Sequence, residues 1–116
     1  MPTRLVSWAK YCDRVTLPVV ATLPDDEIAD ALTALPGWSA AGGAITKQFE
    51  LADFPAAVAF VVRIGFAAEA ADHHPDLDVR YRRVTVTLST HSAGGVTAKD
   101  LDLAATVEGL APGASR

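Results

Sequence analysis

The sequence reads Val84-Thr85-Val86-Thr87-Leu88-Ser89 in its last third, and this stretch decides the fold. Apolar and hydroxyl side chains alternate along it, which indicates a β-strand with one face in the core and the other in solvent. Strands covered on one face only are typical of antiparallel sheets, because parallel sheets are covered on both faces. The stretch therefore predicts an α+β domain whose sheet keeps a polar face carrying Thr85, Thr87 and Ser89.

Two β-hairpins are expected to supply the four strands. The second hairpin joins residues 77–81 to the alternating stretch through a tight turn at Arg82-Arg83. The first joins residues 38–41 to residues 44–51 through Gly42-Gly43, a dipeptide favoured in hairpin turns. The sheet is therefore expected to be mainly antiparallel.

Three helices complete the expected order helix, strand, strand, helix, strand, strand, helix, and they cover one face of the sheet. Each begins at a residue whose side chain is suited to capping backbone N–H groups. The expected spans run from Thr22 to Pro36-Gly37, from Asp53 to about Ala71, and from Thr97 to about Gly109. Asp100, three positions after Thr97, completes a capping-box-like arrangement.

The expected core draws on the first hairpin and on the second helix. In residues 44–51, Phe49 and Leu51 are expected to reach the core, with Ile45 at its edge. The second helix carries a wide apolar stripe that we expect to face inward. The stripe comprises Phe54, Val58, Val61, Val62, Gly65 and Ala68.

The length of 116 residues is most simply one domain with one core. Residues 22–111 are expected to form it, after an irregular N-terminal extension of residues 1–21 and before a flexible tail of residues 112–116. The net charge of −4 disfavours nucleic-acid binding through a basic surface. Cys12 is the only cysteine, which excludes an intrachain disulfide and favours the cytoplasm. Charged residues interrupt the apolar run of residues 51–71, so we expect a soluble helix and no membrane contact.

All three histidines lie in one short part of the sequence. His73-His74-Pro75 follows the second helix, and His91 follows the alternating strand. Histidine is the side chain whose unperturbed pKa lies closest to neutrality. The clustering predicts proton transfer or metal binding where the two loops meet.

A longer pattern surrounds these histidines. It begins as Glu69-Ala70-Ala71-Asp72-His73-His74-Pro75, passes through Tyr81 and His91, and ends at Asp100. The same pattern includes residues 84–91, 94–97, 100–101, 35–38 and 53–54. Over residues 22–109 the chain resembles the pterin-4a-carbinolamine dehydratases.

The resemblance implies removal of water from a 4a-hydroxytetrahydropterin to give a quinonoid dihydropterin. An acid protonates the leaving hydroxyl and a base takes the N5 proton, and groups that titrate near neutral pH suit both tasks. The resemblance implies no metal and no organic cofactor, because the pterin nitrogen supplies the electron pair. It also implies a homotetramer built as a dimer of dimers, and a hydroxylase pathway that recycles a tetrahydrobiopterin-type cofactor.

The resemblance also implies roles for single residues. His73 and His91 are expected to form the principal proton-transfer pair, with His74 as an auxiliary acid or ring-positioning donor. Glu69 and Asp100 are expected to hold the histidines in place or tune them. Substrate contacts are expected from His73, His74, Pro75, Thr90, His91, Ser92 and Ala93.

Each of these residues also has a purely structural interpretation. His91 fits a hydrogen-bonding residue at a strand end, Asp100 a first-turn helix acid, and Glu69 a solvated helix face. Tyr81 fits strand packing better than catalysis. The joint spacing, rather than any one residue, favours the functional interpretation.

Two other classes of function remain open from the sequence. The three histidines with Asp72 and Asp76 form an alternative zinc set, although adjacent histidines rarely converge on one ion. The resemblance also includes dimerisation cofactors of a homeodomain transcription factor and proteins that assist assembly of the carbon-fixing enzyme. The complete histidine set favours the dehydratase over such binding roles.

Overall fold

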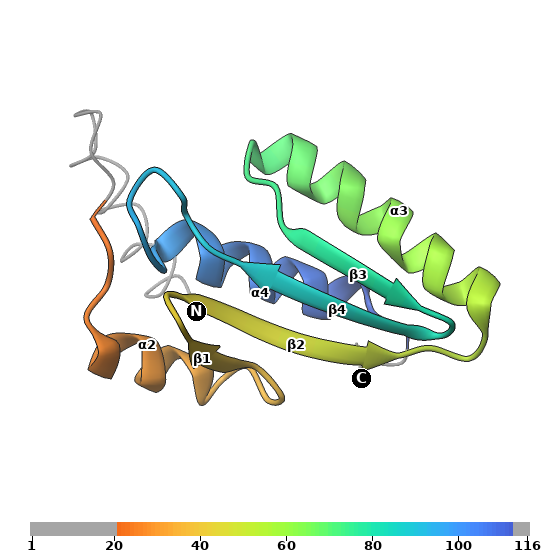
Figure 1. Ribbon diagram of the computed structural model, residues 1–116, viewed down its shortest axis with the longest axis horizontal. Helices are drawn as coiled ribbons and strands as arrows, with labels where there is room; N and C mark the ends of the chain where they lie inside the picture. The colour runs from red at the N-terminus through yellow and green to blue at the C-terminus, as the bar shows by residue number, and fades with distance from the viewer. Residues whose placement is uncertain (1–20, 113–116) are drawn as a thin grey trace.

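The computed structural model describes residues 21–112, and Figure 1 shows their arrangement. The predicted extension and tail lie outside these residues, apart from their innermost positions. The elements, labelled as in Figure 1, are α2 (Asp25–Leu32), β1 (Ser39–Ala41), β2 (Ala44–Glu50), α3 (Phe54–Ala71), β3 (Asp76–Arg80), β4 (Arg83–Leu88) and α4 (Ala98–Leu110). The predicted order of helices and strands is confirmed.

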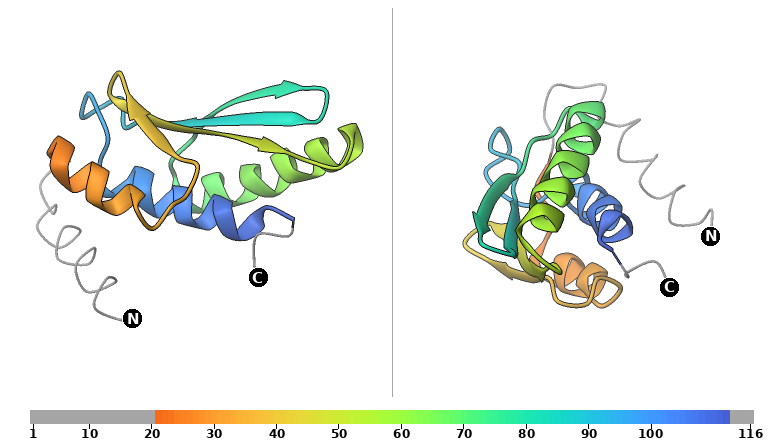
Figure 2. Two further views of the ribbon diagram at one scale, coloured as in Figure 1. Left: turned by 90° about the horizontal axis from the view of Figure 1, so that it is seen from below. Right: turned by 90° about the vertical axis from the view of Figure 1, so that its right-hand side faces the viewer.

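The four strands form one antiparallel sheet in the order β1-β2-β4-β3. Figure 2 shows the three helices on the same side of the sheet, which confirms the predicted α+β class. The other face is polar, as the alternation in β4 predicts. On it Thr46 lies opposite Thr87, and their hydroxyls are 3.1 Å apart.

The inner face of the sheet packs on the helices through a single cluster of buried apolar side chains. Val84, Val86 and Leu88 of β4 are fully buried. Ile45 is fully buried as well, so its predicted place at the edge of the core is wrong. The reason is the strand register: Ile45 pairs with Leu88, and the central β2–β4 pair carries the core along its whole length.

The core face of α3 differs from the predicted one. The buried side chains are Ala57, Phe60, Ile64 and Ala68, with Val61 partly covered. Phe54, Val58, Val62 and Gly65 lie outside the core, so the predicted stripe is wrong except at Val61 and Ala68. The cause is that α3 is apolar around most of its circumference. Two different faces of the helix therefore match the apolar spacing equally well.

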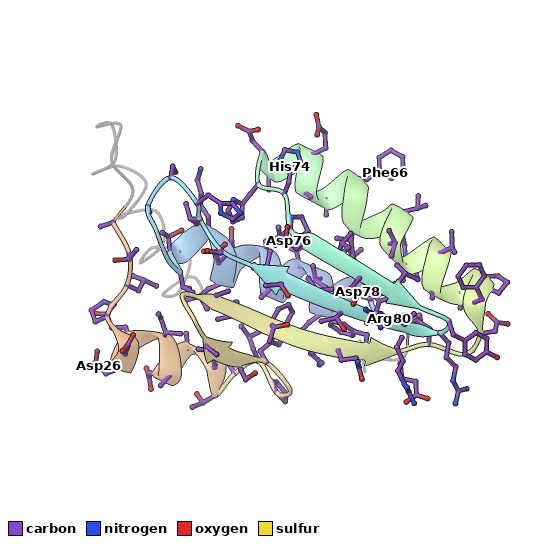
Figure 3. All side chains as sticks on the ribbon, in the orientation of Figure 1. Asp26, Phe66, His74, Asp76, Asp78 and Arg80 are labelled. Carbon is purple, nitrogen blue, oxygen red and sulfur yellow. The ribbon has the colours of Figure 1, made fainter. Side chains whose placement is uncertain are left out.

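The apolar residues left uncovered on α3 form a ridge of four side chains, which we call the α3 ridge. They are Phe54 at 50% exposure, Val58 at 43%, Val62 at 52% and Phe66 at 75%. Figure 3 shows Phe66 pointing away from the body of the domain. In the part of the chain that is described, α3 alone is long and apolar enough to cross a membrane, a test that core helices of soluble proteins also pass.

Local boundaries also differ from prediction, and the first helix ends at Leu32 rather than at Pro36-Gly37. The helix α2 begins after Pro24 rather than after Thr22, because the N–H of Leu23 is already bonded to the carbonyl of Val96. The β3–β4 turn lies at Tyr81-Arg82 rather than Arg82-Arg83, since Arg80 pairs with Arg83. Tyr81 has a φ of 55° in this turn and is 70% exposed, so it does not pack in the sheet.

Candidate functional site

Three segments distant in sequence meet at one end of the domain. They are the residues after α3, the loop after β4 and the first turn of α4 (Figure 1). Figure 3 places His74 at the junction of α3 and β3. The segments enclose a cavity of about 290 Å³, which is lined by Asp72, His73, His74, Ser89, Thr90, His91, Ser92 and Lys99.

The C-terminus of α3 directs His73 into this cavity. Asp72 caps the helix in the left-handed conformation with a φ of 53°, a conformation that short polar side chains tolerate. The N–H of Asp72 bonds to the carbonyl of Glu69, and the N–H of His73 bonds to that of Ala68. The helix end therefore closes on itself and turns the chain sharply toward the sheet.

The loop after β4 is closed by backbone hydrogen bonds. The N–H of Thr90 donates to Gly95 across a single bridge, and the N–H of Gly94 donates back to Thr90. Gly94 has a φ of +79°, where a side chain would be strained. This closure leaves His91 exposed at the start of the loop, beside the cavity.

Asp100 is the buried anchor of the site, with no exposed surface. One carboxylate oxygen, Oδ2, accepts from the Thr97 N–H at 2.9 Å and from the Thr90 hydroxyl at 2.8 Å. The other oxygen, Oδ1, lies 2.5 Å from Nε2 of His73, whose side chain is 10% exposed. Asp100 therefore completes the predicted capping box and also holds a histidine, so the two interpretations of this residue coexist.

His74 and Glu69 form a second pair, with Nε2 and Oε1 3.0 Å apart. Both side chains are exposed, at 61% and 81%. Exposed ion pairs contribute about 0–1 kcal/mol, because water and salt screen them. His74 is therefore held much less firmly than His73.

If the chain catalyses the dehydration that the resemblance implies, we expect Glu69→Gln to change its rate constant by less than about threefold, because the exposed pair orients His74 only weakly. A steady-state comparison with the unmodified chain measures this. A loss comparable to that of a His73 variant would show that Glu69 acts in the chemistry itself.

His91 is the histidine without a protein partner. Its ring makes no hydrogen bond to any other residue within 21–112. Both ring nitrogens are therefore available to a bound molecule. The site combines one histidine anchored on a buried carboxylate with one that is free, which suits a base and an acid acting on one substrate.

The remaining predicted contacts divide into two groups. Ser92 lines the cavity, whereas Pro75 and Ala93 are half-buried and are not part of its wall. Thr90 lines the cavity too, but its buried hydroxyl is committed to Asp100. Substrate contact stays a prediction for all of these residues.

Lys99 is a cavity residue that the sequence reasoning missed. It lines the wall with Ser89 and Asp72. Its position directly before Asp100, in the first turn of the predicted helix, was the available signal. The side chain supplies a positive charge beside the histidines.

No group of three or more His, Cys, Asp or Glu side chains in residues 21–112 has the arrangement of a metal site. A larger cavity of about 750 Å³ lies between α2, the β1–β2 hairpin and residues 94–96. Asp25 is the one titratable residue among the described residues that line it. The titratable side chains are concentrated around the smaller, histidine-lined cavity.

The fold and the cavity define a class of protein: a small α+β domain with a histidine-lined cavity where a helix end meets a sheet. Residues 21–110 match the family model for pterin 4 alpha carbinolamine dehydratase. The chain belongs to this family.

Individual relatives agree with this assignment. A protein of Roseiflexus castenholzii named "Putative pterin-4-alpha-carbinolamine dehydratase" is 54% identical over 90 residues, which cover 78% of this chain and 97% of the relative. A protein of the same name from Nocardia farcinica is 53% identical over 89 residues, covering 77% and 94%.

Solved structures show the same similarity. A crystal structure titled as a transcriptional coactivator/pterin dehydratase from Brucella melitensis matches with a TM-score of 0.75 and 40% identity, over 78% of this chain and 98% of that one. A pterin dehydratase-like protein, described as a RuBisCO assembly factor in the alpha-carboxysome, matches with a TM-score of 0.54 over 65% and 87%. At 21% identity, this second match shows the fold alone.

Proposed function

We propose that the protein dehydrates a 4a-hydroxytetrahydropterin to the quinonoid dihydropterin. The observation that carries this proposal is the grouping of His73, His74 and His91 around one cavity. His73 is anchored on Asp100, and the His91 ring has no hydrogen-bond partner among the described residues. Family membership supports the choice of a pterin as substrate. A cavity of about 290 Å³ lies just below the usual range for ligand pockets, a size that suits a small flat ring system.

The reaction requires two proton transfers. The C4a–O bond breaks as an acid protonates the hydroxyl, which leaves as water. The N5 lone pair forms the new C4a=N5 bond, and a base takes the N5 proton, whose bonding electron pair stays on nitrogen. We assign these roles to His73 and His91, with His74 as an auxiliary donor, and the pterin nitrogen supplies the electron push without a metal or an organic cofactor.

An assay of the wild-type chain tests the proposed activity. An aromatic amino-acid hydroxylase generates the 4a-hydroxypterin in place, and its dehydration is followed by absorbance. We expect the chain to raise the rate well above the protein-free rate. An unchanged rate would reject the proposed activity.

We further propose that the chain assembles with copies of itself, as a tetramer built from two dimers. The α3 ridge supports this, because contiguous exposed apolar surface marks interaction sites. The cytoplasm and a hydroxylase pathway are the proposed setting, which the single cysteine supports.

We expect Phe66→Glu to reduce the assembly to smaller species. Phe66 is 75% exposed, so the change leaves the isolated fold intact while placing a charge on the α3 ridge. Light scattering at micromolar concentration measures the mass. Arg63→Glu, also at an exposed position on α3 but outside the ridge, is the matched control; a monomeric wild type would contradict the proposed assembly.

A binding role on the same fold is the second candidate function. The uncovered α3 ridge favours it, and the similar Brucella melitensis protein is described as a transcriptional coactivator/pterin dehydratase. Pull-down with candidate partners, using wild type and a His73→Ala/His91→Ala variant, separates the two roles. Partner capture that survives the double variant, without dehydratase activity in the wild type, would favour binding.

A further inference from the structure

A chain of buried hydroxyls lies behind His73. The Thr97 and Thr90 hydroxyl oxygens are 2.8 Å apart, and the Thr90 hydroxyl is 2.8 Å from Oδ2 of Asp100. Thr97 and Asp100 have no exposed surface, and Thr90 is 4% exposed. Water therefore does not compete for these groups, and their hydrogen bonds have to be satisfied among themselves.

The direction of each hydrogen bond in this chain follows from the partners. An ionised carboxylate only accepts, so the Thr90 hydroxyl donates to Asp100. That leaves the Thr90 oxygen to accept from the Thr97 hydroxyl. The Thr97 oxygen in turn accepts from the N–H of Lys99 at 3.2 Å. The hydrogen-bond partner of each hydroxyl proton in this network is therefore determined.

The directions of these hydrogen bonds determine which ring nitrogen of His73 carries the proton. Oδ2 of Asp100 carries two donors, the Thr90 hydroxyl and the Thr97 N–H. Oδ1 faces Nε2 of His73 at 2.5 Å, and this contact requires a proton on Nε2. A neutral imidazole has one N–H, so Nδ1 of His73 carries a lone pair.

We propose that Thr90 and Thr97 are positioning residues that hold His73 in the Nε2–H tautomer, which makes Nδ1 the atom that takes the N5 proton of the pterin. The inference rests on the proposed function for the identity of the substrate. It assigns the base to His73 and leaves the acid to His91. His73 gains a proton as His91 loses one to the departing hydroxyl, and exchange with solvent resets both rings.

Nitrogen-15 NMR of the imidazole rings tests the tautomer directly, without any assay of activity. The spectrum is recorded on ¹⁵N-histidine-labelled full-length chain at a pH where the rings are neutral, and a His73→Gln variant assigns the signals. We expect the proton of His73 on Nε2. A wild-type ring protonated on Nδ1 would overturn the proposal.

Variants then test the hydroxyl chain. Thr90→Val and Thr97→Val keep the shape of the side chain and remove the hydroxyl, so both are expected to mix the His73 tautomers. We expect kcat to fall by about 10- to 100-fold, the equivalent of one hydrogen bond to a charged group, with KM nearly unchanged. Thr90→Ser and Thr97→Ser should restore both readouts, and Thr46→Val on the open sheet face is the matched control.

The outcomes distinguish the positioning role of the two threonines from the proposed dehydratase function. Valine variants that keep a pure Nε2–H tautomer and wild-type kcat would refute a positioning role for the hydroxyls. If Thr97→Val does not fold because the α4 cap is lost, Thr90→Val and the wild-type spectrum decide. A wild-type Nε2–H tautomer in a chain without dehydratase activity would reject the proposed function and still support the tautomer.

Discussion

His91→Ala is expected to lower the dehydration rate constant by about 10²–10⁴-fold, the usual contribution of one acid–base group. Its exposed ring has no hydrogen-bond partner within residues 21–112, so the change removes chemistry without removing a structural contact. We expect the thermal midpoint to stay within about 2 °C of the wild type, since exposed substitutions rarely alter stability. Steady-state kinetics and thermal unfolding on one preparation measure both quantities.

A second histidine of the same cavity, His74, provides a control for the His91 variant. His74→Ala removes a ring that is 61% exposed and pairs with an exposed Glu69. We expect its loss of rate to be about tenfold or less, because an auxiliary donor on the surface is replaced in part by water. A severe loss from His74→Ala together with a mild one from His91→Ala would reverse the assignment of roles.

Asp100→Ala is expected to destabilise the fold by about 3 kcal/mol and to abolish measurable activity. The substitution leaves the Thr90 hydroxyl, the Thr97 N–H and the His73 ring without their acceptor, and a buried donor left unpaired costs about 1–3 kcal/mol. The capping box at the start of α4 is lost as well. For a domain of this size the thermal midpoint should fall by more than about 10 °C.

Asp102→Ala is the matched control for Asp100. It removes the same side chain two positions later in α4, at an exposed site. We expect its effect on the free energy of unfolding to be within about 0.5 kcal/mol. Equal destabilisation by the two variants would mean that the network around Asp100 contributes little.

Much of the fold follows from local sequence signals. Some signals act over a few residues and can be predicted without tertiary context. They are the alternation in β4, the Gly42-Gly43 turn and the caps at Asp53 and Thr97. The core face of α3 cannot be predicted from local sequence in this way. Its circumference is apolar nearly all round, and only packing against α4 and the sheet selects Phe60 and Ile64 over Phe54 and Val62.

The candidate site divides in the same manner. The grouping of the histidines with Asp100 follows from spacing and from resemblance. The order of hydrogen bonds from Thr97 through Thr90 to Asp100 cannot be predicted from the sequence, because it depends on where β4 ends relative to α4. Lys99 was missed for a related reason: its position beside Asp100 was a signal, but the cavity that it lines forms only where three distant segments meet in the fold.

The most direct test of the central claim compares the wild type with a His73→Ala/His91→Ala variant in the dehydration of enzymatically generated 4a-hydroxytetrahydropterin. We expect the variant to fall to the protein-free rate while keeping its fold by circular dichroism, because the remaining His74 is only loosely held. Equal rates for the two proteins would contradict catalysis by the histidine-lined cavity.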